Sequence, residues 1–257
     1  MTCGTVYLVG AGPGDPELLT VKGRRLIGEA DAIVYDHLVS RELLELAGPR
    51  CELVFAGKKA GAFCRPQGEI EGMLVRLALA GKTVVRLKGG DPLIFGRGGE
   101  EAAALRAAGV PFEIVPGVTA ALAAAAYAGI PLTHRAHSSA VLLVTGHEDP
   151  SKPDTAVRWA EYAKIKGTLC IYMGVRNLAT ITRLLEEGGL EADTPAAIVQ
   201  SATTESHRAI LGTLGTLAAK AAAAGIEAPA MVIVGEVAAL SEKLAWFDRA
   251  RREEVAR

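Results

Sequence analysis

Short runs of β-branched and other apolar residues alternate along the first half of the chain with longer stretches rich in alanine and leucine. The short runs predict strands at residues 5–9, 32–35, 83–87 and 112–115. The longer stretches between them predict helices. Strands that alternate with helices form a parallel sheet with both faces covered, so we expect an α/β fold.

One predicted helix has a clear period. Ile70, Leu74 and Leu77 recur at helical spacing within residues 67–80, with Met73 beside them, and charged residues occupy other positions. Gly81 follows directly and is a good C-cap, because glycine readily adopts a left-handed backbone. The pattern therefore predicts an amphipathic helix that ends at this glycine.

The alternation begins again after a predicted helix at residues 119–127. Further strands are predicted at residues 140–144, 168–172, 196–199, 208–211 and 231–234. The third and fourth of these are joined by a short polar link, which favours antiparallel pairing and hence a mixed sheet. We place the boundary at Pro116 and Gly117, which gives an N-terminal α/β domain at residues 1–116 and a C-terminal α/β domain at 117–257.

Composition narrows the class of protein. Hydrophobic residues make up 50% of the 257 residues and mean hydropathy is +0.26, enough for one large core or two smaller ones. The 28 basic and 29 acidic residues give a net charge of -1, so no global field recruits nucleic acid or an acidic membrane surface. An anionic substrate must therefore be held by local arginines.

The expected location is the cytoplasm. The chain does not start with a basic segment followed by an apolar run, so no secretory signal is expected. The most apolar stretch, residues 118–132, is interrupted by Gly129 and Pro131 and is shorter than the roughly 20 residues that a membrane span needs. Four cysteines stand in no metal-ligand spacing, so they are expected to be reduced packing residues and no metal site is predicted: Cys3, Cys51, Cys64 and Cys170.

Candidate chemistry lies in a long motif at residues 86–101, which begins at the end of a predicted strand and continues into a glycine turn. Gly89 and Gly90 leave no Cβ in the way, so backbone groups can approach a ligand, and Asp91 can anchor one of its polar groups. The alternative is that these glycines only make a tight strand-to-helix connection. Glycine turns at residues 10–15 and 116–120 also follow predicted strands, so we expect the three loops to form one ligand site.

The first glycine turn matches a dinucleotide-binding fingerprint only in part. That pattern needs G-x-G-x-x-G at the start of a helix, whereas Asp15 stands at the last glycine position and Pro13 and Pro16 delay the helix. Asp36 does stand at the end of the second strand, where such a fold places an acidic residue. An NAD(P)-dependent oxidoreductase therefore remains a competing hypothesis.

Taken together, the motifs resemble those of the uroporphyrinogen-III C-methyltransferases, members of the tetrapyrrole methylase family. The resemblance covers residues 4–247. The stretches that carry it are residues 9–15, 18–20, 35–39, 57–58, 86–101, 129–135, 145–147 and 172–174.

The resemblance implies transfer of two methyl groups from S-adenosylmethionine to carbons C2 and C7 of uroporphyrinogen III. The product is precorrin-2, formed via precorrin-1, with S-adenosylhomocysteine as by-product; it leads to sirohaem, cobalamin or haem d1. The family fold has two α/β domains with the ligand cleft between them, and two chains form a homodimer. The chain is similar to a stand-alone methylase, and a sister methylase acting on another tetrapyrrole is the nearest alternative.

The resemblance also assigns roles to residues. Asp36 is the expected proton acceptor and Lys58 the expected proton donor, and Arg97 and Glu100 complete the catalytic set. Substrate acetate and propionate groups are expected to bind Arg97 and Arg135, because a guanidinium recognises a carboxylate at two points. His37 is a further expected substrate contact, since it stands at a position where the family often has arginine. Glu100, on the same helix face as Arg97, is expected to orient it or to approach a pyrrole N–H. The expected donor site comprises Pro13, Gly89, Gly90, Asp91, Ile94, Thr119, Ala120, Met173 and the backbone of Ala202.

Several of these roles have a structural alternative. Asp36 can be the cap of a following helix, and Lys58 can be one of two solvated neighbouring lysines. Met173 can be a thioether that packs in the core at a strand end. Arg97 and Glu100 can form a surface ion pair that contributes little to stability.

Overall fold

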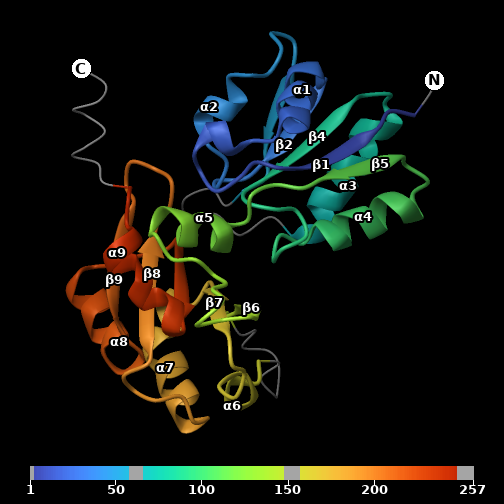
Figure 1. Cartoon of the computed structure of the whole chain (residues 1–257). Helices are drawn as coiled ribbons and strands as arrows, with labels where there is room; N and C mark the ends of the chain where they lie inside the picture. The colour runs from blue at the N-terminus through green and yellow to red at the C-terminus, as the bar shows by residue number, and fades with distance from the viewer. Residues whose placement is uncertain (1–2, 58–65, 148–156, 248–257) are drawn as a thin grey trace, which may run out of the picture. The chain divides into compact units, whose positions relative to one another are not determined.

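The computed structural model describes residues 3–57, 66–147 and 157–247 (Figure 1). The chain forms two compact units, Met1–Ala120 and Ala121–Arg257. The division falls a few residues beyond the position at which the sequence pattern places it. Each unit is built on a five-stranded sheet with helices, so the expected α/β class is confirmed.

The first unit contains a parallel sheet with the strand order β3-β2-β4-β1-β5. Its strands are β1 (Val6–Gly10), β2 (Ala32–Tyr35), β3 (Glu52–Phe55), β4 (Val84–Lys88) and β5 (Phe112–Val115). The sequence pattern predicts all of them except β3. That strand lies at the edge of the sheet and its first two residues are exposed, so it lacks the apolar run of a buried parallel strand.

Helices cover both faces of this sheet, as Figure 1 shows. Successive residues of a strand point to opposite faces, so Val84 packs with Leu74 on one side and Val85 packs with Leu26 on the other. The helices on the Val85 side are α1 (Val21–Glu29) and α2 (Arg41–Leu44); those on the Val84 side are α3 (Gln67–Leu79) and α4 (Gly98–Ala107). A short 3-10 turn, η1 (Pro16–Leu18), precedes α1.

The helix predicted at residues 67–80 is confirmed as α3. Ile70 and Leu74 from its predicted apolar stripe are buried. Ala80 is the C-cap, and Gly81 follows with φ 83°, the left-handed conformation expected of it.

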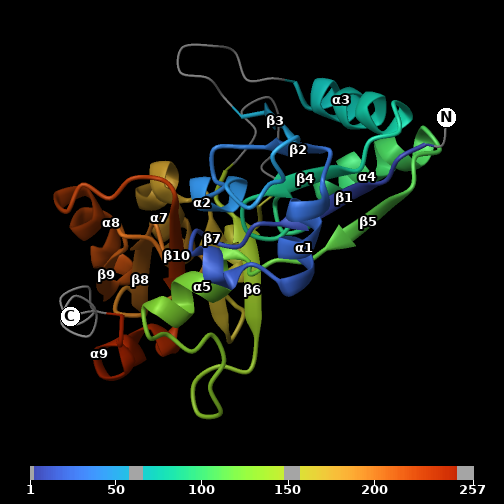
Figure 2. The same ribbon diagram turned by 90° about the horizontal axis from the view of Figure 1, so that it is seen from above.

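The second unit contains a mixed sheet with the strand order β6-β7-β10-β8-β9, which can be followed from strand to strand in Figure 2. Its strands are β6 (Val141–Thr145), β7 (Thr168–Tyr172), β8 (Pro195–Gln200), β9 (Arg208–Thr213) and β10 (Ala230–Val234). β6 is parallel to β7, whereas β10 is antiparallel to both β7 and β8. β8 and β9 pair antiparallel, as their short link predicts.

Helices and 3-10 turns complete the second unit. Trp159, Ile181 and Leu217, from three different helices, share one core with Ile171 of β7 and Val232 of β10. The elements are α5 (Ala120–Tyr127), α6 (Trp159–Tyr162), η2 (Val175–Asn177), α7 (Leu178–Glu187), α8 (Leu214–Ala223), η3 (Glu236–Leu240) and α9 (Ser241–Leu244).

The cysteines differ in their surroundings. Cys170 is buried in β7, and burial raises the pKa of its thiol to about 12. Cys51 is half-buried and packs against the core, but Cys3 is exposed, so its prediction as a packing residue is wrong. Cys64 lies outside the described residues.

Over residues 3–57, 66–147 and 157–247, every helix is too short or too polar to span a bilayer.

Candidate active site

The glycine loops after β1, β4 and β5 pack directly against one another at the carboxyl edge of the first sheet. Gly90 N donates to Gly12 O at 2.7 Å and Gly12 N donates to Gly90 O at 3.2 Å. A Cβ on Gly117 would lie 2.3 Å from Gly90 O, and one on Gly10 would lie 2.6 Å from the Cα of Gly117. The structure therefore brings the three predicted loops together.

Gly89 and Gly90 also have a role in packing between protein loops. Both backbone polar groups of Gly90 are bound to Gly12, and a Cβ on Gly89 would lie 2.6 Å from the Cβ of Leu38. The missing side chains thus permit close packing between protein loops. The contact of Gly89 and Gly90 with a donor stays a prediction.

Asp91 ties two of these loops together. Its Oδ1 accepts a hydrogen bond from Leu93 N at 2.8 Å, and its Oδ2 accepts one from Gly117 N at 3.0 Å. Both carboxylate oxygens therefore already accept hydrogen bonds from backbone amides. Its contact with a ligand stays a prediction.

Left-handed backbone gathers at the predicted donor residues. Within the described part of the chain, the non-glycine residues with positive φ are Phe95, Arg97, Met173, Ser201 and Thr203, with φ between 46° and 74°. Such conformations are costly, most of all for a β-branched threonine, and they concentrate at functional sites. Two of them lie in the loop that contains Ile94, one is Met173 itself, and two flank Ala202.

The second unit also brings predicted motif residues together. Because β7 and β8 are both antiparallel to β10, their carboxyl ends, followed by Met173 and Ala202, lie at the same edge of that sheet. Gly146 N donates to Tyr172 O at 2.7 Å, which joins two of the motifs. Met173 is exposed, so the alternative of a core thioether is wrong.

The remaining predicted donor residues are in the first unit. Pro13 and Ile94 are half-buried in the loops after β1 and β4. Thr119 is buried, and Ala120 begins α5. Their contact with a donor is a prediction that rests on the motifs.

Asp36 directly follows β2 and is fixed from two directions. Its Oδ1 accepts a hydrogen bond from Leu38 N at 3.1 Å, and its Oδ2 lies 3.4 Å from Nη2 of Arg86. The next helix, α2, has Ser40 at its N-cap, so the alternative that Asp36 caps this helix is wrong.

A buried cluster of charges adjoins Asp36, and the motif interpretation did not single it out. Arg86 and Lys88 are on β4 and Glu101 is on α4, with side chains 5%, 5% and 0% exposed. Glu101 Oε1 accepts hydrogen bonds from Arg86 Nε at 3.0 Å, Lys88 Nζ at 3.1 Å and Gln67 Nε2 at 3.5 Å. Burial and the neighbouring Arg86 lower the pKa of Lys88 from its ordinary value, against the opposing effect of Glu101. The sequence contains one feature that could have revealed this cluster, a pair of cations in alternate positions of an otherwise apolar strand.

Arg97 and Glu100 form the ion pair that their spacing predicts. Arg97 Nε and Nη2 donate to Glu100 Oε1 and Oε2 at 2.9 and 2.6 Å, and both side chains are more than half exposed. This hydrogen bonding raises the pKa of Arg97 and lowers that of Glu100. Glu100 thus orients Arg97, and a substrate carboxylate must use the remaining N–H groups or displace Glu100.

The other predicted site residues lie in three separate segments of the chain. His37 is exposed beside Asp36, and Arg135 is exposed in the connection between α5 and β6 of the second unit. Lys58 lies outside the described residues, so its role stays a prediction.

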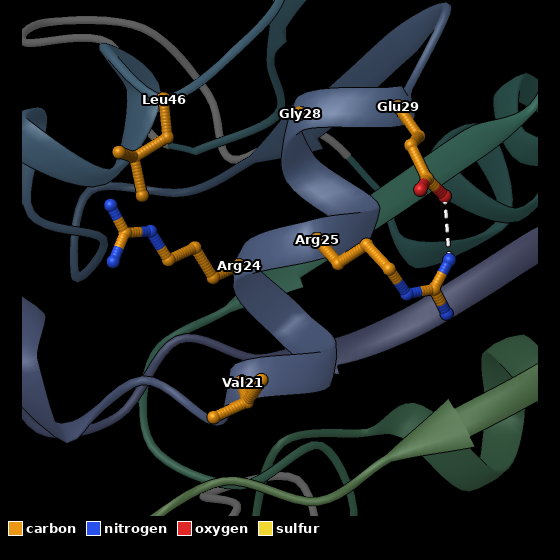
Figure 3. Close-up of a pocket in the computed structure, with 6 residues that line it drawn as sticks. All are labelled: Val21, Arg24, Arg25, Gly28, Glu29 and Leu46. Atoms are coloured by element: carbon orange, nitrogen blue, oxygen red, sulfur yellow. Dashed lines mark hydrogen bonds and ion pairs between the residues drawn. The ribbon is translucent and has the colours of Figure 1, made fainter.

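A depression on the first unit is lined by other residues. It is formed by α1 and the segment after α2, and its lining residues are Val21, Arg24, Arg25, Gly28, Glu29 and Leu46 (Figure 3). The Arg25 guanidinium pairs with Glu29 at 2.6 Å. This depression contains none of the predicted site residues.

Comparisons with known proteins place the chain in a family. The family model of the tetrapyrrole (corrin/porphyrin) methylases matches residues 5–218. The siroheme synthase of Stutzerimonas stutzeri (strain A1501) is 50% identical over 248 residues, which are 96% of this chain and 53% of that protein. The siroheme synthase of Methylococcus capsulatus is likewise 50% identical, over 99% of this chain and 53% of its own length. The chain therefore spans about half the length of these curated relatives.

Solved structures give the same result. A uroporphyrin-III C-methyl transferase from Thermus thermophilus, complexed with S-adenyl homocysteine, has a TM-score of 0.77 and 42% identity, over 92% of this chain and 100% of that one. The cobalamin biosynthetic enzyme cobalt precorrin-4 methyltransferase has a TM-score of 0.81 and 32% identity, over 91% of this chain and 95% of that one. This chain belongs to the tetrapyrrole (corrin/porphyrin) methylases.

Proposed function

We propose that the protein transfers two methyl groups from S-adenosylmethionine to C2 and C7 of uroporphyrinogen III, forming precorrin-2 via precorrin-1. The observation that carries this proposal is the 42% identity to the whole length of the Thermus thermophilus uroporphyrin-III C-methyl transferase. The 50% identity to siroheme synthases supports a product that leads to sirohaem.

The backbone at the predicted donor residues fits a small molecule of this kind. Left-handed residues follow Ile94, flank Ala202 and include Met173, and such backbone presents amides and carbonyls in fixed directions. The donor, when bound, supplies a methyl group already activated on a sulfonium. The protein therefore needs no nucleophilic side chain and has to align the reactants and exclude water.

Asp36 is the proposed acceptor of the proton that the substrate ring loses after it gains a methyl group. Its side chain is 23% exposed, so it is accessible to a substrate. The Leu38 amide and Arg86 fix the orientation of its carboxylate. A base in a fixed orientation suits proton transfer, which depends first on geometry. Lys58 is the proposed proton donor.

Exposed cations are proposed to bind the substrate carboxylates. Arg97, held by Glu100, and Arg135 offer planar guanidinium groups, and His37 is exposed next to Asp36. A substrate that carries an acetate and a propionate on each ring suits several such contacts.

The second candidate is a sister methylase that acts on a later corrinoid. The TM-score of 0.81 to cobalt precorrin-4 methyltransferase favours it, but the identity of 32% is lower than the 42% of the first candidate. The family match does not favour the oxidoreductase hypothesis.

The test is anaerobic incubation of the protein with uroporphyrinogen III and S-adenosylmethionine, followed by mass spectrometry of the tetrapyrrole. We expect a gain of two methyl groups. No gain, with donor binding measured by calorimetry, would favour the sister methylase. Loss of donor binding as well would contradict both candidates.

We also propose that the protein acts in the cytoplasm as a homodimer. These two statements rest on the sequence motifs and their family resemblance. Analytical ultracentrifugation of the purified chain tests the second one, and a monomer at micromolar concentration would contradict it.

A further inference from the structure

The buried charges next to Asp36 are costly for the fold. Glu101 is fully buried, yet its Oε2 has no hydrogen-bond partner among the described residues. Leaving a buried carboxylate oxygen unpaired is destabilising, and buried ion pairs are often no better for stability than apolar residues of similar size. Stability alone therefore does not explain this cluster.

The geometry of Arg86 indicates what the cluster does. Its Nε donates to Glu101, its Nη1 donates to Val34 O at 3.3 Å and to Leu87 O at 3.0 Å, and its Nη2 faces Asp36. These contacts fix the plane of the guanidinium on four acceptors. The planar fork of arginine suits this arrangement, whereas an ammonium does not.

The strand register explains why Arg86 reaches Asp36. Arg86 is paired with Val34 on the neighbouring strand β2, and Asp36 lies two positions further along the chain. Residues two apart point to the same face, which is the face covered by α3 and α4. The carboxylate of Asp36 therefore meets the guanidinium at the carboxyl edge of the sheet.

We propose that Arg86 is a positioning residue for Asp36, and that Glu101 is the buried counter-ion that holds Arg86 in place. This inference rests on the proposed role of Asp36 as proton acceptor. The 3.4 Å separation between Arg86 Nη2 and Asp36 Oδ2 is long for a hydrogen bond but short for an ion pair. Arg86 thus acts on Asp36 by orientation and by charge, and it touches no substrate.

Lys88 provides a matched control. It is on the same strand, is equally buried, and donates to the same oxygen of Glu101. Among the contacts of the described residues, however, it makes none to Asp36. Arg86→Gln and Lys88→Gln each replace a buried cation by the same amide, and each removes a charge that acts on Asp36 through space, but only the first removes a direct contact with its carboxylate.

We expect Arg86→Gln to lower kcat about tenfold or more while the donor Kd and the acceptor KM change by less than about threefold. Lys88→Gln should leave kcat within about threefold of wild type. Melting temperatures measure the structural cost of both variants. If Arg86→Gln does not fold, Arg86→Lys replaces it. An ammonium lacks the planar fork that contacts Glu101 through Nε and Asp36 through Nη2, so kcat should still fall.

The decisive measurement is a double-mutant cycle with Asp36→Asn. We expect Asp36→Asn to lower kcat about a hundredfold or more. Adding Arg86→Gln should then cause no further loss, since Arg86 acts through Asp36.

The results of these experiments distinguish a failure of the proposed function from a failure of the inference about Arg86. No methylation by the wild type contradicts the proposed function. Unchanged kcat in Asp36→Asn overturns the proton-acceptor role and, with it, this inference. Losses that multiply in the double variant, or equal losses in Arg86→Gln and Lys88→Gln, overturn the inference alone.

Discussion

At the scale of the residue, Asp91 shows how one side chain can serve both the fold and the site. Its carboxylate joins the loop after β4 to the loop after β5 through the amides of Leu93 and Gly117. We expect Asp91→Ala to lower the free energy of unfolding by about 1–3 kcal/mol, because two amides lose their acceptor. Donor affinity should also fall about tenfold or more, since the loops that carry the site lose their link.

Asp31 supplies the control for this variant. Its Oδ2 accepts a hydrogen bond from Thr83 N at 2.8 Å, just before β2 and β4 begin, at the opposite edge of the sheet. Asp31→Ala should therefore lower stability with little change in donor affinity. Calorimetry of both variants measures the difference, and wild-type donor affinity in Asp91→Ala would contradict the placing of the donor at this turn.

Arg97 gives a second prediction at this scale. Arg97→Gln should raise the acceptor KM about tenfold or more, because the proposed two-point contact with a substrate carboxylate is lost. The melting temperature should change little, since exposed ion pairs contribute little to stability. Arg158→Gln is the control, because Arg158 forms a similarly spaced exposed pair with Glu161. Unchanged KM and turnover in Arg97→Gln would exclude the carboxylate contact.

Residues differ in how far the sequence reveals their role. The Arg97–Glu100 pair was predicted from helical spacing, and it forms although Arg97 is the left-handed N-cap residue just before α4. The contact between Arg86 and Asp36 depends on which strands are neighbours in the sheet, and the sequence alone does not give that order. Glycine positions were predictable as turns, but their close packing against other loops depends on contacts between segments that are distant in the sequence.

At the scale of the element, the site depends on how closely three loops approach. A Cβ on Gly117 would collide with Gly90 O, so Gly117→Ala should push the loops after β4 and β5 apart. We expect a loss of about 1–3 kcal/mol in the free energy of unfolding, as for other overpacked sites. Donor affinity should fall with it.

Gly72, in the middle of α3, is the matched control. A Cβ there would meet only the end of the flexible Arg76 side chain, at 3.3 Å. Gly72→Ala should therefore increase the free energy of unfolding by up to about 1 kcal/mol through its helix preference, with donor affinity unchanged. Wild-type stability and donor affinity in Gly117→Ala would contradict the role given to this close approach.

At the scale of the whole molecule, the alternation of strands and helices was sufficient to predict an α/β chain with a mixed sheet in its second half. The sequence pattern did not predict β3, because an edge strand needs no continuous apolar run. The order of the strands and the covering of each face depend on contacts between distant segments. These features therefore came from the structure.

The stability of the whole molecule should depend on pH through His207. Its ring packs against Phe247, with centroids 4.9 Å apart, and its Nδ1 has no hydrogen-bond partner in the described part of the chain. Burial lowers the pKa of this imidazole below its ordinary value of 6.5. The folded state therefore disfavours the proton that the unfolded state accepts.

The sign of the effect follows from proton uptake. Below pH 6.5 the unfolded chain binds more protons at this residue than the folded chain, so stability falls as the pH falls towards the lowered pKa. His207→Phe should remove the part of the acid-induced fall in stability that protonation of His207 causes. The melting temperature of this variant should therefore fall less than that of the wild type between pH 7 and about pH 5. His147→Phe, at an exposed position, is the control and should follow the wild type. Parallel curves for His207→Phe and the wild type would mean that His207 does not govern acid stability.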